Sequence, residues 1–373
     1  MRFLSNSTDI IELAENRSAT DAPRLWFEEE GAVTKGVKIA AFFIIFIVCL
    51  LGNCLLIAVV YKNANQRMRT PSNYFIVNMA CADLFLVVYS VPQNTAMTAQ
   101  DYRWLLSGVA GELFCRLYYF MTEMSVLVVT GCLFCVALDR FLLVFYPLKK
   151  IITLRIARRV IAVVWIFAIV FTTPLFFMAT LIEVRSEFLV CTFNFSILRL
   201  VVIYFLFCFI PTILIPLIII IILYIAIGVK IKQAIPPGNQ LPSTQAEQRE
   251  RMTHKVLTML AAIVAVLIVF RFPLLTGMIA CFSGATDLCR QPNYMFVSWF
   301  LAFTNSAINP LIYFIFNDHF RHGARLVLEK IIPCCFKTAN EVDAIQSSVH
   351  QMVRTRQQQL DEIARLNQSD THY

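Results

Sequence analysis

The residues of this chain that can do chemistry are charged and polar side chains placed inside long apolar runs. Asp139 and Arg140 stand together at the end of the apolar run 124–138, and Asn309 with Pro310 stands near the end of another. Ionised residues are costly in segments that span lipid, and proline removes a helical hydrogen bond. The chemistry on offer is therefore charge pairing and helix bending, which we interpret as signalling across a membrane.

Enzymatic chemistry is not expected. The sequence contains no paired His, Asp and Glu motif, no phosphate-binding loop and no metal-ligand spacing. These patterns are the ones that indicate hydrolases, nucleotide-dependent enzymes and metalloenzymes. We therefore predict that the chain is no enzyme and that it carries no cofactor.

The elements that position these residues are predicted to be membrane-spanning helices. The chain is 58% hydrophobic and 15% charged, whereas a soluble domain carries more charge. A helix needs roughly 20 apolar residues to cross the bilayer core, and continuous apolar runs exclude the alternating strands of a membrane barrel. The predicted fold class is an all-α membrane protein, a seven-transmembrane helix bundle with a short amphipathic eighth helix. The seven runs are 37–61, 72–96, 112–144, 158–181, 198–231, 254–282 and 293–316.

Lysine and arginine predict the orientation of the bundle. They gather in the connections after the first, third and fifth runs and again after the seventh, and such an excess marks the cytoplasmic side. We expect a multi-pass plasma-membrane protein whose N-terminus is extracellular and whose C-terminus is cytoplasmic. The net charge of +8 reflects this bias, so contact with membrane lipid is expected and nucleic-acid binding is not. The predicted regions are an extracellular tail 1–36, a transmembrane domain 37–316, an amphipathic helix with a lipidation site 317–335, and a cytoplasmic tail 336–373.

Four cysteines lie on the predicted outer side, where the compartment favours disulfides. Cys115 stands at the outer end of the third run, and Cys191 stands in the second outer loop. A bridge between them would fix that loop across the outer mouth of the bundle. Cys281 and Cys289 flank the third outer loop and are candidates for a second, local bridge, although sequence alone does not determine the pairing.

Both tails carry candidate modification sites. Asn6 and Asn16 begin glycosylation sequons on the outer tail. Cys334 and Cys335 follow the amphipathic helix and are predicted to be palmitoylated, the alternative being an ordinary reduced pair. Serine and threonine residues in the polar C-terminal tail are candidate phosphorylation sites, through which arrestin would bind.

A second group of polar residues lies deeper within the predicted spans. Because lipid offers them no hydrogen bonds, we expect them to face each other inside the bundle. Such a cluster with one carboxylate either holds a cation or water, or is a static packing network; Pro310 beside it favours a hinge. The residues are Asn53 in the first run, Asp83 in the second, and Asn305, Ser306 and Asn309 in the seventh.

Several of these residues belong to an ordered set of motifs, with at least one in each run. The set resembles the rhodopsin-like (class A) G-protein-coupled receptors over roughly residues 37–335, and its order across seven runs makes the resemblance specific. It comprises Gly52-Asn53, Asp83, Cys115, Asp139-Arg140, Trp165, Pro216 with Tyr224, Pro273, and Asn309-Pro310 followed by Tyr313.

The resemblance implies a mechanism. An extracellular ligand would shift the packing of the helices, and their inner ends would open for a heterotrimeric G protein. Arg140 would pair with Asp139 at rest and contact Tyr224 or the G protein when active, while Tyr313 would swing inward beside it. The agonist then needs only to bind the open bundle more tightly than the closed one.

The sequence departs from the family pattern at a few positions. Val129 replaces a serine that commonly helps to hold sodium, which makes a sodium site at Asp83 doubtful. Arg271 stands where the family has an aromatic residue, and an unpaired arginine in the core is costly. Glu123 lies at a matching depth, so we expect Arg271 to pair with Glu123 or Asp83. The alternative is that Arg271 points into a wet pocket and binds an acidic ligand group or chloride.

The ligand is predicted to be a neuropeptide. Amine receptors have an aspartate where this chain has Thr122, and Asp101, Glu112, Glu183 and Glu187 around the mouth would attract a basic peptide unless they only form a solvated rim. An amine or other small-molecule receptor and a constitutively active or decoy receptor remain alternatives, the latter because Thr253 replaces an acid that often faces the arginine. A channel or transporter is a remote alternative. The candidate pocket residues are Thr122, Glu123, Val126, Arg271 and Phe303.

Overall fold

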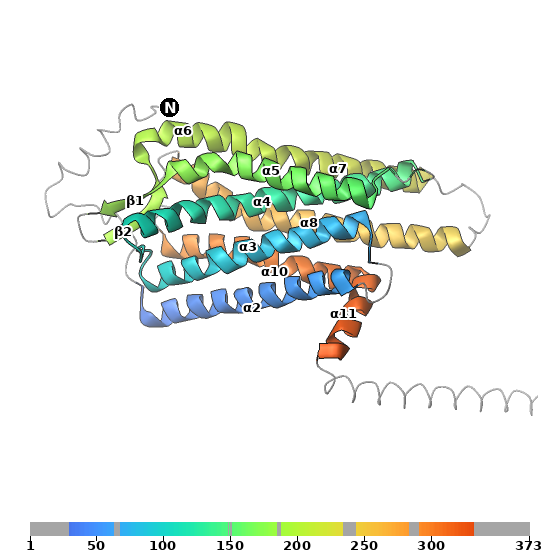
Figure 1. Cartoon of the computed structure of the whole chain (residues 1–373), viewed down its shortest axis with the longest axis horizontal. Coiled ribbons are helices and arrows are strands. Elements are labelled where there is room, and N and C mark those ends of the chain that lie inside the picture. Colours follow the sequence, from blue (N-terminus) through green and yellow to red (C-terminus); the bar gives the residue numbers. More distant parts are fainter. Residues whose placement is uncertain are drawn as a thin grey trace, which may run out of the picture.

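Seven helices of the described chain are long and apolar enough to cross a membrane, which confirms the predicted fold class. The computed structural model describes residues 30–62, 68–147, 149, 151–184, 188–233, 244–282 and 291–331. The long helices run side by side along one axis (Figure 1). They are α2 (Ala32–Lys62), α3 (Pro71–Ala99), α4 (Gly108–Phe145), α5 (Leu154–Met178), α7 (Ile210–Gln233), α8 (Thr244–Phe282) and α10 (Pro292–Phe316). Short helical segments that precede α7 belong to the same span.

Several helices extend beyond the apolar runs that predicted them. α2 begins at Ala32, inside the predicted outer tail, and α8 begins at Thr244, before the predicted residue 254. The added turns of α8 contain Gln, Glu and Arg, which are strong helix formers. A helix therefore continues into water for as long as its residues favour helix, whereas hydropathy reports only the part suited to lipid.

α4 occupies the centre of the bundle. It packs against α3, α5 and α7, and its outer end contacts a β-hairpin. Buried side chains occur along almost its whole length, from Gly111 to Asp139. This central helix carries the outer cysteine, the buried Glu123 and the inner Asp139-Arg140 pair, so one rigid element joins the two ends of the molecule.

The fifth span is not a single α-helix. It consists of α6 (Leu198–Ile203), the π-helical segment η2 (Tyr204–Phe209) and α7. The N–H of Ile210 donates to the carbonyl of Phe205, which is the longer π spacing. Pro211 follows and has no N–H to donate, so the regular ladder cannot pass through this point. The sequence predicted only one continuous apolar run here.

A β-hairpin follows α5 where the sequence predicted more helix. The predicted fourth run extended to residue 181, but α5 ends at Met178 and the strand β1 (Ala179–Val184) begins at once. β1 pairs antiparallel with β2 (Phe188–Phe193). Three of the six residues of β1, namely Thr180, Ile182 and Val184, are β-branched and favour a strand. The hairpin lies at the end of the bundle opposite α11 (Figure 1).

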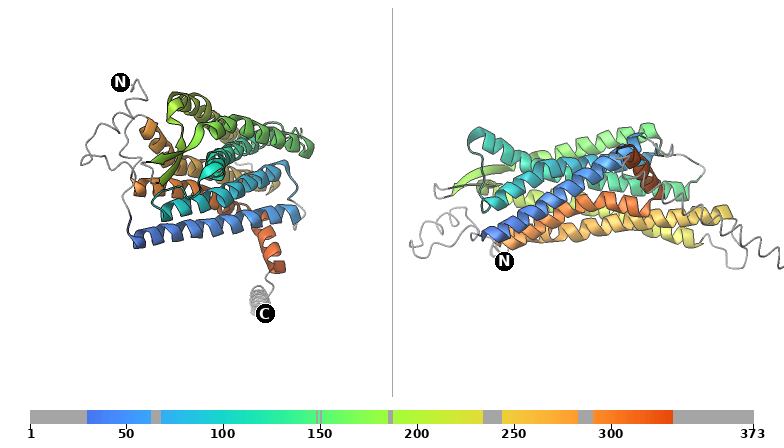
Figure 2. Two further views of the ribbon diagram at one scale, coloured as in Figure 1. Left: turned by 60° about the vertical axis from the view of Figure 1, so that its left-hand side comes forward. Right: turned by 90° about the horizontal axis from the view of Figure 1, so that it is seen from below.

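The predicted eighth helix is present as α11 (Asp318–Ile331). It turns away from the axis of the bundle after α10 (Figure 2) and packs on the end of α2. Phe320 and Val327 are buried, and a Cβ on Gly323 would come within 2.6 Å of Val59 Cγ1. The glycine thus allows the two helices to approach closely.

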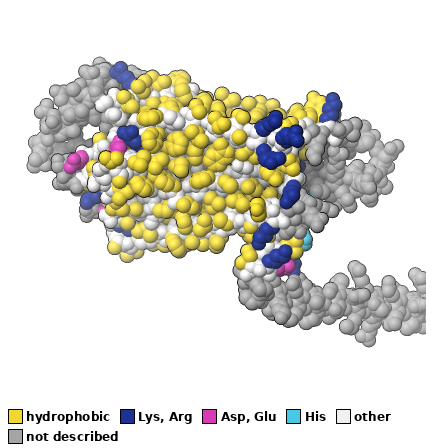
Figure 3. Space-filling model, in the orientation of Figure 1, with side chains coloured by type: hydrophobic (Ala, Val, Ile, Leu, Met, Phe, Trp, Pro, Cys, Tyr) yellow, Lys and Arg dark blue, Asp and Glu magenta, His cyan; other side chains and the backbone are white. Residues whose placement is uncertain are grey.

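The outer surface of the bundle is apolar. Ile215, Ile218 and Phe207 are among the exposed hydrophobic side chains of the fifth span. Figure 3 shows a broad apolar band over the helices, with lysine and arginine gathered at the end where α11 lies. A surface of this kind suits lipid, because large apolar patches are rare on soluble proteins.

Candidate functional site

The polar residues predicted to meet inside the bundle are brought together between α2, α3 and α10. Asn309 Nδ2 donates to Asp83 Oδ2 at 3.0 Å, and both residues are buried. Asn53 Nδ2 donates to the carbonyl of Ser306 at 3.3 Å and to that of Cys49 at 3.0 Å. The cluster therefore links three helices through side chains that could find no such partners in lipid.

Pro310, which the sequence predicts to form a hinge, lies tightly against α2. A Cβ on Gly52 would come within 3.1 Å of Pro310 Cβ, so only glycine leaves room for this contact without a shift. Pro310 belongs to α10 and cannot donate a backbone hydrogen bond within it. The weak point of α10 is thus held directly by the backbone of α2, next to Asn53.

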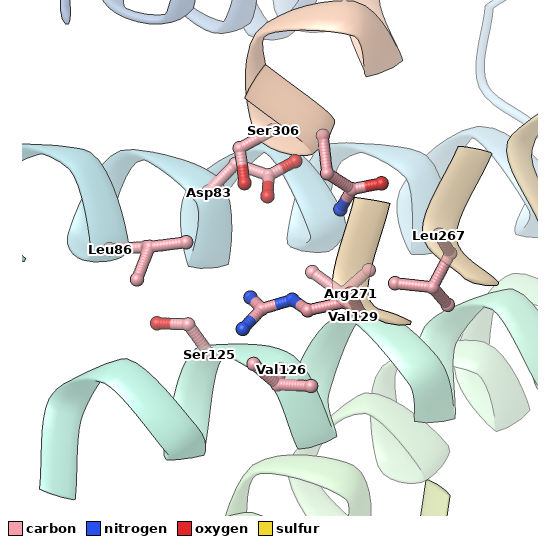
Figure 4. Close-up of a pocket in the computed structure, with 9 residues that line it drawn as sticks. Asp83, Leu86, Ser125, Val126, Val129, Leu267, Arg271 and Ser306 are labelled. Atoms are coloured by element: carbon pink, nitrogen blue, oxygen red, sulfur yellow. The ribbon is translucent and has the colours of Figure 1, made fainter. Parts of the chain in front are cut away.

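A small cavity lies beside this cluster, and Arg271 of α8 reaches into it. Figure 4 shows its guanidinium between Asp83 and Ser306 on one side and Ser125 and Val126 on the other. Leu86, Val129, Leu267 and Asn305 complete the lining. A positive side chain thus occupies the space beside the carboxylate of Asp83, and it would repel a sodium ion there. No cluster of metal-ligating residues occurs within the described ranges.

Arg271 faces both acids that were expected as its partners, but in the described structure it forms no ion pair with either of them. Both Glu123 and Asp83 attract the guanidinium, Glu123 more strongly. Within the described residues, however, Arg271 makes no ion pair by direct contact, and its Nε is buried without a hydrogen-bond partner. Glu123 is only 7% exposed. The structure therefore holds one cation and two acids inside the bundle without joining them.

Near the C-terminal end of α4, Asp139 and Arg140 meet through a third residue. Arg140 Nη2 lies 3.7 Å from Asp139 Oδ2. The hydroxyl of Ser72 donates to Asp139 and accepts from Arg140. Ser72 lies in the first turn of α3, so this bridge ties α3 to α4. This role could not be predicted from the sequence, because an isolated serine at the start of a span is common.

The hydroxyl groups of the two tyrosines predicted to act near Arg140 both lie inside the bundle. Tyr224 of α7 lies within electrostatic reach of Arg140, and its hydroxyl is buried without a hydrogen-bond partner. Tyr313 of α10 is 1% exposed, and its hydroxyl is 3.8 Å from Met79 Sδ. Their predicted movement on activation stays a prediction.

At the end of the bundle opposite α11, the hairpin is fixed over the helices by a disulfide and by a carboxylate. Cys115 of α4 is bonded to Cys191 of β2. Glu112 accepts from the backbone N–H of Leu181 at 2.8 Å and pairs with Arg116 at 2.8 Å. The chain before α4 adds another hold, since the N–H of Trp104 donates to the carbonyl of Leu189 at 2.7 Å.

Aromatic rings gather beneath the hairpin. Tyr119 lies 4.3 Å from Phe193 between ring centroids, and Tyr118 lies 5.7 Å from Trp299. Asn94 Nδ2 donates to the hydroxyl of Tyr118 at 2.9 Å. The bundle beneath the hairpin therefore contains packed aromatic rings with hydrogen-bonding groups beside them.

The structure divides the candidate pocket residues between a small inner cavity and buried packing positions. Thr122 is buried and shares a hydrogen bond of 2.7 Å with Ser90. Phe303 is fully buried, stacked at 5.7 Å on Trp299, and serves packing. Val126 and Arg271 line the small inner cavity, as described above.

Two of the four acids predicted around the mouth are engaged by the protein itself. Glu112 is engaged by the hairpin, and Asp101 forms an ion pair of 2.6 Å with Lys35 of α2. Lys38 is buried and pairs with Glu30. Burial raises the pKa of the neighbouring Tyr102, whose hydroxyl donates to the carbonyl of Pro292 at 2.9 Å. These charges fasten the outer ends of the helices to each other, which lowers the number of acids available to a ligand. Glu187 lies outside the described residues.

Several predicted modification sites lie outside the part of the chain that the structure describes. They are the glycosylation sites Asn6 and Asn16, the palmitoylation sites Cys334 and Cys335, and Cys289 of the second disulfide, so its bond to Cys281 stays a prediction.

The comparisons with known proteins agree with this architecture. Residues 52–313 match the family described as "7 transmembrane receptor (rhodopsin family)", and the chain belongs to that family. It is 30% identical to Neuropeptide FF receptor 2 of Mus musculus over 77% of this chain and 71% of that receptor. It is 28% identical to Neuropeptide receptor 22 of Caenorhabditis elegans over 80% and 71%, respectively. It is 26% identical to Substance-K receptor of Bos taurus over 85% and 81%.

Proposed function

We propose that this chain is a plasma-membrane receptor that binds an extracellular peptide and activates a heterotrimeric G protein. The observation that carries the proposal is its similarity, along most of its length, to receptors named for neuropeptides. The outer architecture supports it. The disulfide-held hairpin and the aromatic rings beneath it would supply a bound peptide with both backbone and side-chain partners.

An amine ligand has less support. Receptors for amines need a carboxylate where this chain has Thr122, and the hydroxyl of Thr122 is already bonded to Ser90. The adjacent Glu123 is the nearest acid in the sequence, but it is buried and faces the charge of Arg271. A cationic amine would therefore compete with an internal cation for this carboxylate.

The inner end supports coupling to a G protein. Lysine and arginine gather at the end where α11 lies (Figure 3), which favours a cytoplasmic location for that end and an extracellular location for the hairpin. Arg140 is held there by Asp139 and Ser72, and Tyr224 lies within electrostatic reach of it. In the proposed active state Arg140 leaves this bridge for the G protein. Arrestin binding to a phosphorylated tail and lipid anchoring at Cys334 and Cys335 complete the proposal.

The test is peptide-stimulated nucleotide exchange by the purified full chain in lipid nanodiscs. A library of synthetic neuropeptides is first screened on cells that express the chain with a promiscuous G protein, and the active peptide is then used in the exchange assay. We expect acceleration by wild type, a large loss in Arg140→Ala, and retention in Arg159→Ala, which changes an exposed arginine of α5.

Three results would contradict the proposal. A response to amines alone would replace the peptide with an amine. A ligand-free current or solute uptake would indicate a channel or transporter. Equal exchange by Arg140→Ala and wild type with every G protein would remove the coupling role.

A further inference from the structure

The charges buried at the middle of the bundle come from three different helices. Asp83 belongs to α3, Glu123 to α4 and Arg271 to α8. The two acids are 1% and 7% exposed, respectively. Opposite charges attract each other over longer distances inside a protein than in water, because the interior screens them less. The guanidinium therefore pulls α8 toward the two central helices.

The packing of α8 makes this attraction consequential. Among the described residues, the backbone of α8 lies mainly against α10 and touches α7 only slightly. The long side chain of Arg271 crosses from α8 toward α3 and α4 (Figure 4). Its position is close to Pro273, where α8 lacks a backbone hydrogen bond and bends most easily. One charged side chain thus acts at the place where α8 is most free to move.

The lack of direct contact is equally informative. Arg271 Nε has no hydrogen-bond partner, and neither acid touches the guanidinium. Where a buried ion pair is in close contact, removing one partner strongly destabilises the protein, because the other charge is left uncompensated. Charges that attract across a small cavity are coupled more weakly, so the helix can be released by a modest force.

We propose that Arg271 is an electrostatic latch that holds α8 against Glu123 and Asp83 and keeps the ligand-free receptor inactive. The proposal rests on the proposed function, because its readout is nucleotide exchange. An agonist would release the latch by binding the conformation in which α8 has moved away, in keeping with population shift. The latch would set the basal activity of this chain. Thr253 replaces the acid that often faces the arginine of the third span, so an ion pair between helices is not expected there.

The experiment measures ligand-free nucleotide exchange, normalised to the number of receptors in nanodiscs. We expect Arg271→Met to raise basal exchange roughly fivefold or more, at the low end of common coupling strengths. Arg271→Lys keeps the charge and should stay closer to wild type. Glu123→Gln and Asp83→Asn weaken the latch from the other side and should also raise basal exchange. Phe272→Leu is the matched control, because Phe272 is adjacent on α8 and 61% exposed.

A double-mutant cycle separates charge from shape. If the latch exists, adding Glu123→Gln to Arg271→Met raises basal exchange no further, and the reversed pair Arg271→Glu with Glu123→Arg recovers part of the surface expression lost in either single variant. Wild-type basal exchange in Arg271→Met, Glu123→Gln and Asp83→Asn alike would overturn the proposal. So would an effect of Arg271→Met that simply adds to those of both acid variants.

Poor folding does not hide the answer. If Arg271→Met fails to reach the surface, Glu123→Gln and Asp83→Asn decide, since each leaves the arginine in place. Failure of the receptor proposal itself looks different: wild type would then show no exchange with any peptide and any G protein, and the latch would be tested by the thermal stabilities of the same cycle, where additive losses overturn it.

Discussion

At the residue scale, single polar side chains join helices that the sequence leaves separate. Ser72 is the clearest case, because its hydroxyl stands between Asp139 and Arg140 and touches both. Asp139 is 5% exposed. A buried carboxylate needs donors, and a serine hydroxyl supplies one while it accepts from the arginine. The inner pair is therefore a three-residue bridge between α3 and α4.

Ser72→Ala should lower the stability of the inactive receptor by about 1–3 kcal/mol, because it removes a donor from a buried charge. Arg140 is then held by Asp139 alone, so basal nucleotide exchange should also rise. Thermal unfolding in detergent measures the first effect and ligand-free exchange the second. Ser107→Ala is the control, since Ser107 is exposed and makes no side-chain cap bond. Equal melting temperatures for Ser72→Ala and Ser107→Ala would contradict the bridge.

At the element scale, close approach of backbones decides how the helices and the hairpin are held. α2 and α10 meet where Gly52 faces Pro310, and the hairpin is held by Glu112, Cys115 and Trp104. These contacts position α10 and the hairpin. The receptor proposal requires α10 to bend and the hairpin to cover the ligand-binding end of the bundle.

Gly52→Leu should destabilise the bundle by about 1–3 kcal/mol, because the new side chain overfills the contact with Pro310. Gly36→Leu changes the same helix at a position where an added Cβ meets nothing within 4 Å, so it should be tolerated. Thermal unfolding of both variants provides the comparison. A similar melting temperature for the two would show that α10 does not depend on this contact.

Glu112→Gln should loosen the hairpin while the disulfide remains. The charged acceptor of the Leu181 N–H is lost, and hydrogen bonds to charged groups contribute roughly 1.5–3 kcal/mol. Amide exchange of β1, measured by mass spectrometry, should then be about tenfold faster or more. Glu329→Gln, which removes a carboxylate paired with Arg325 on α11, is the control. Unchanged exchange in β1 would mean that the disulfide alone fixes the hairpin.

At the scale of the whole molecule, the distribution of charge along the bundle axis supports one orientation. Exposed apolar side chains cover the middle, and lysine and arginine gather at one end (Figure 3). The opposite end carries the hairpin and ion pairs such as Lys35 with Asp101. An excess of basic residues is retained on the cytoplasmic side, so the ligand would approach the hairpin.

An epitope tag at the N-terminus should be stained on intact cells, and a tag at the C-terminus only after permeabilisation. The physical reason is the basic excess at the α11 end, which resists transfer across the membrane. Flow cytometry with and without detergent makes the measurement, and a cytosolic marker serves as the control for leakage. Staining of the C-terminal tag on intact cells would reverse the proposed orientation.

The sequence by itself determined the number and type of the spans, the eighth helix and the family. Hydropathy is a local property, and helices in lipid satisfy their own backbone, so neighbouring residues suffice to predict them. Motifs such as Asn309-Pro310 are equally local. The buried polar set around Asp83 was also predictable, because polar residues in lipid have only each other as partners.

Only the tertiary structure decided which side chains meet. The bridge by Ser72 and the use of Glu112 to hold the hairpin depend on how helices rotate and approach each other. The same holds for the start of β1 at Ala179, which the apolar run concealed. Hydropathy carries no information on these contacts, because a residue that faces lipid and one that faces a neighbouring helix are equally apolar.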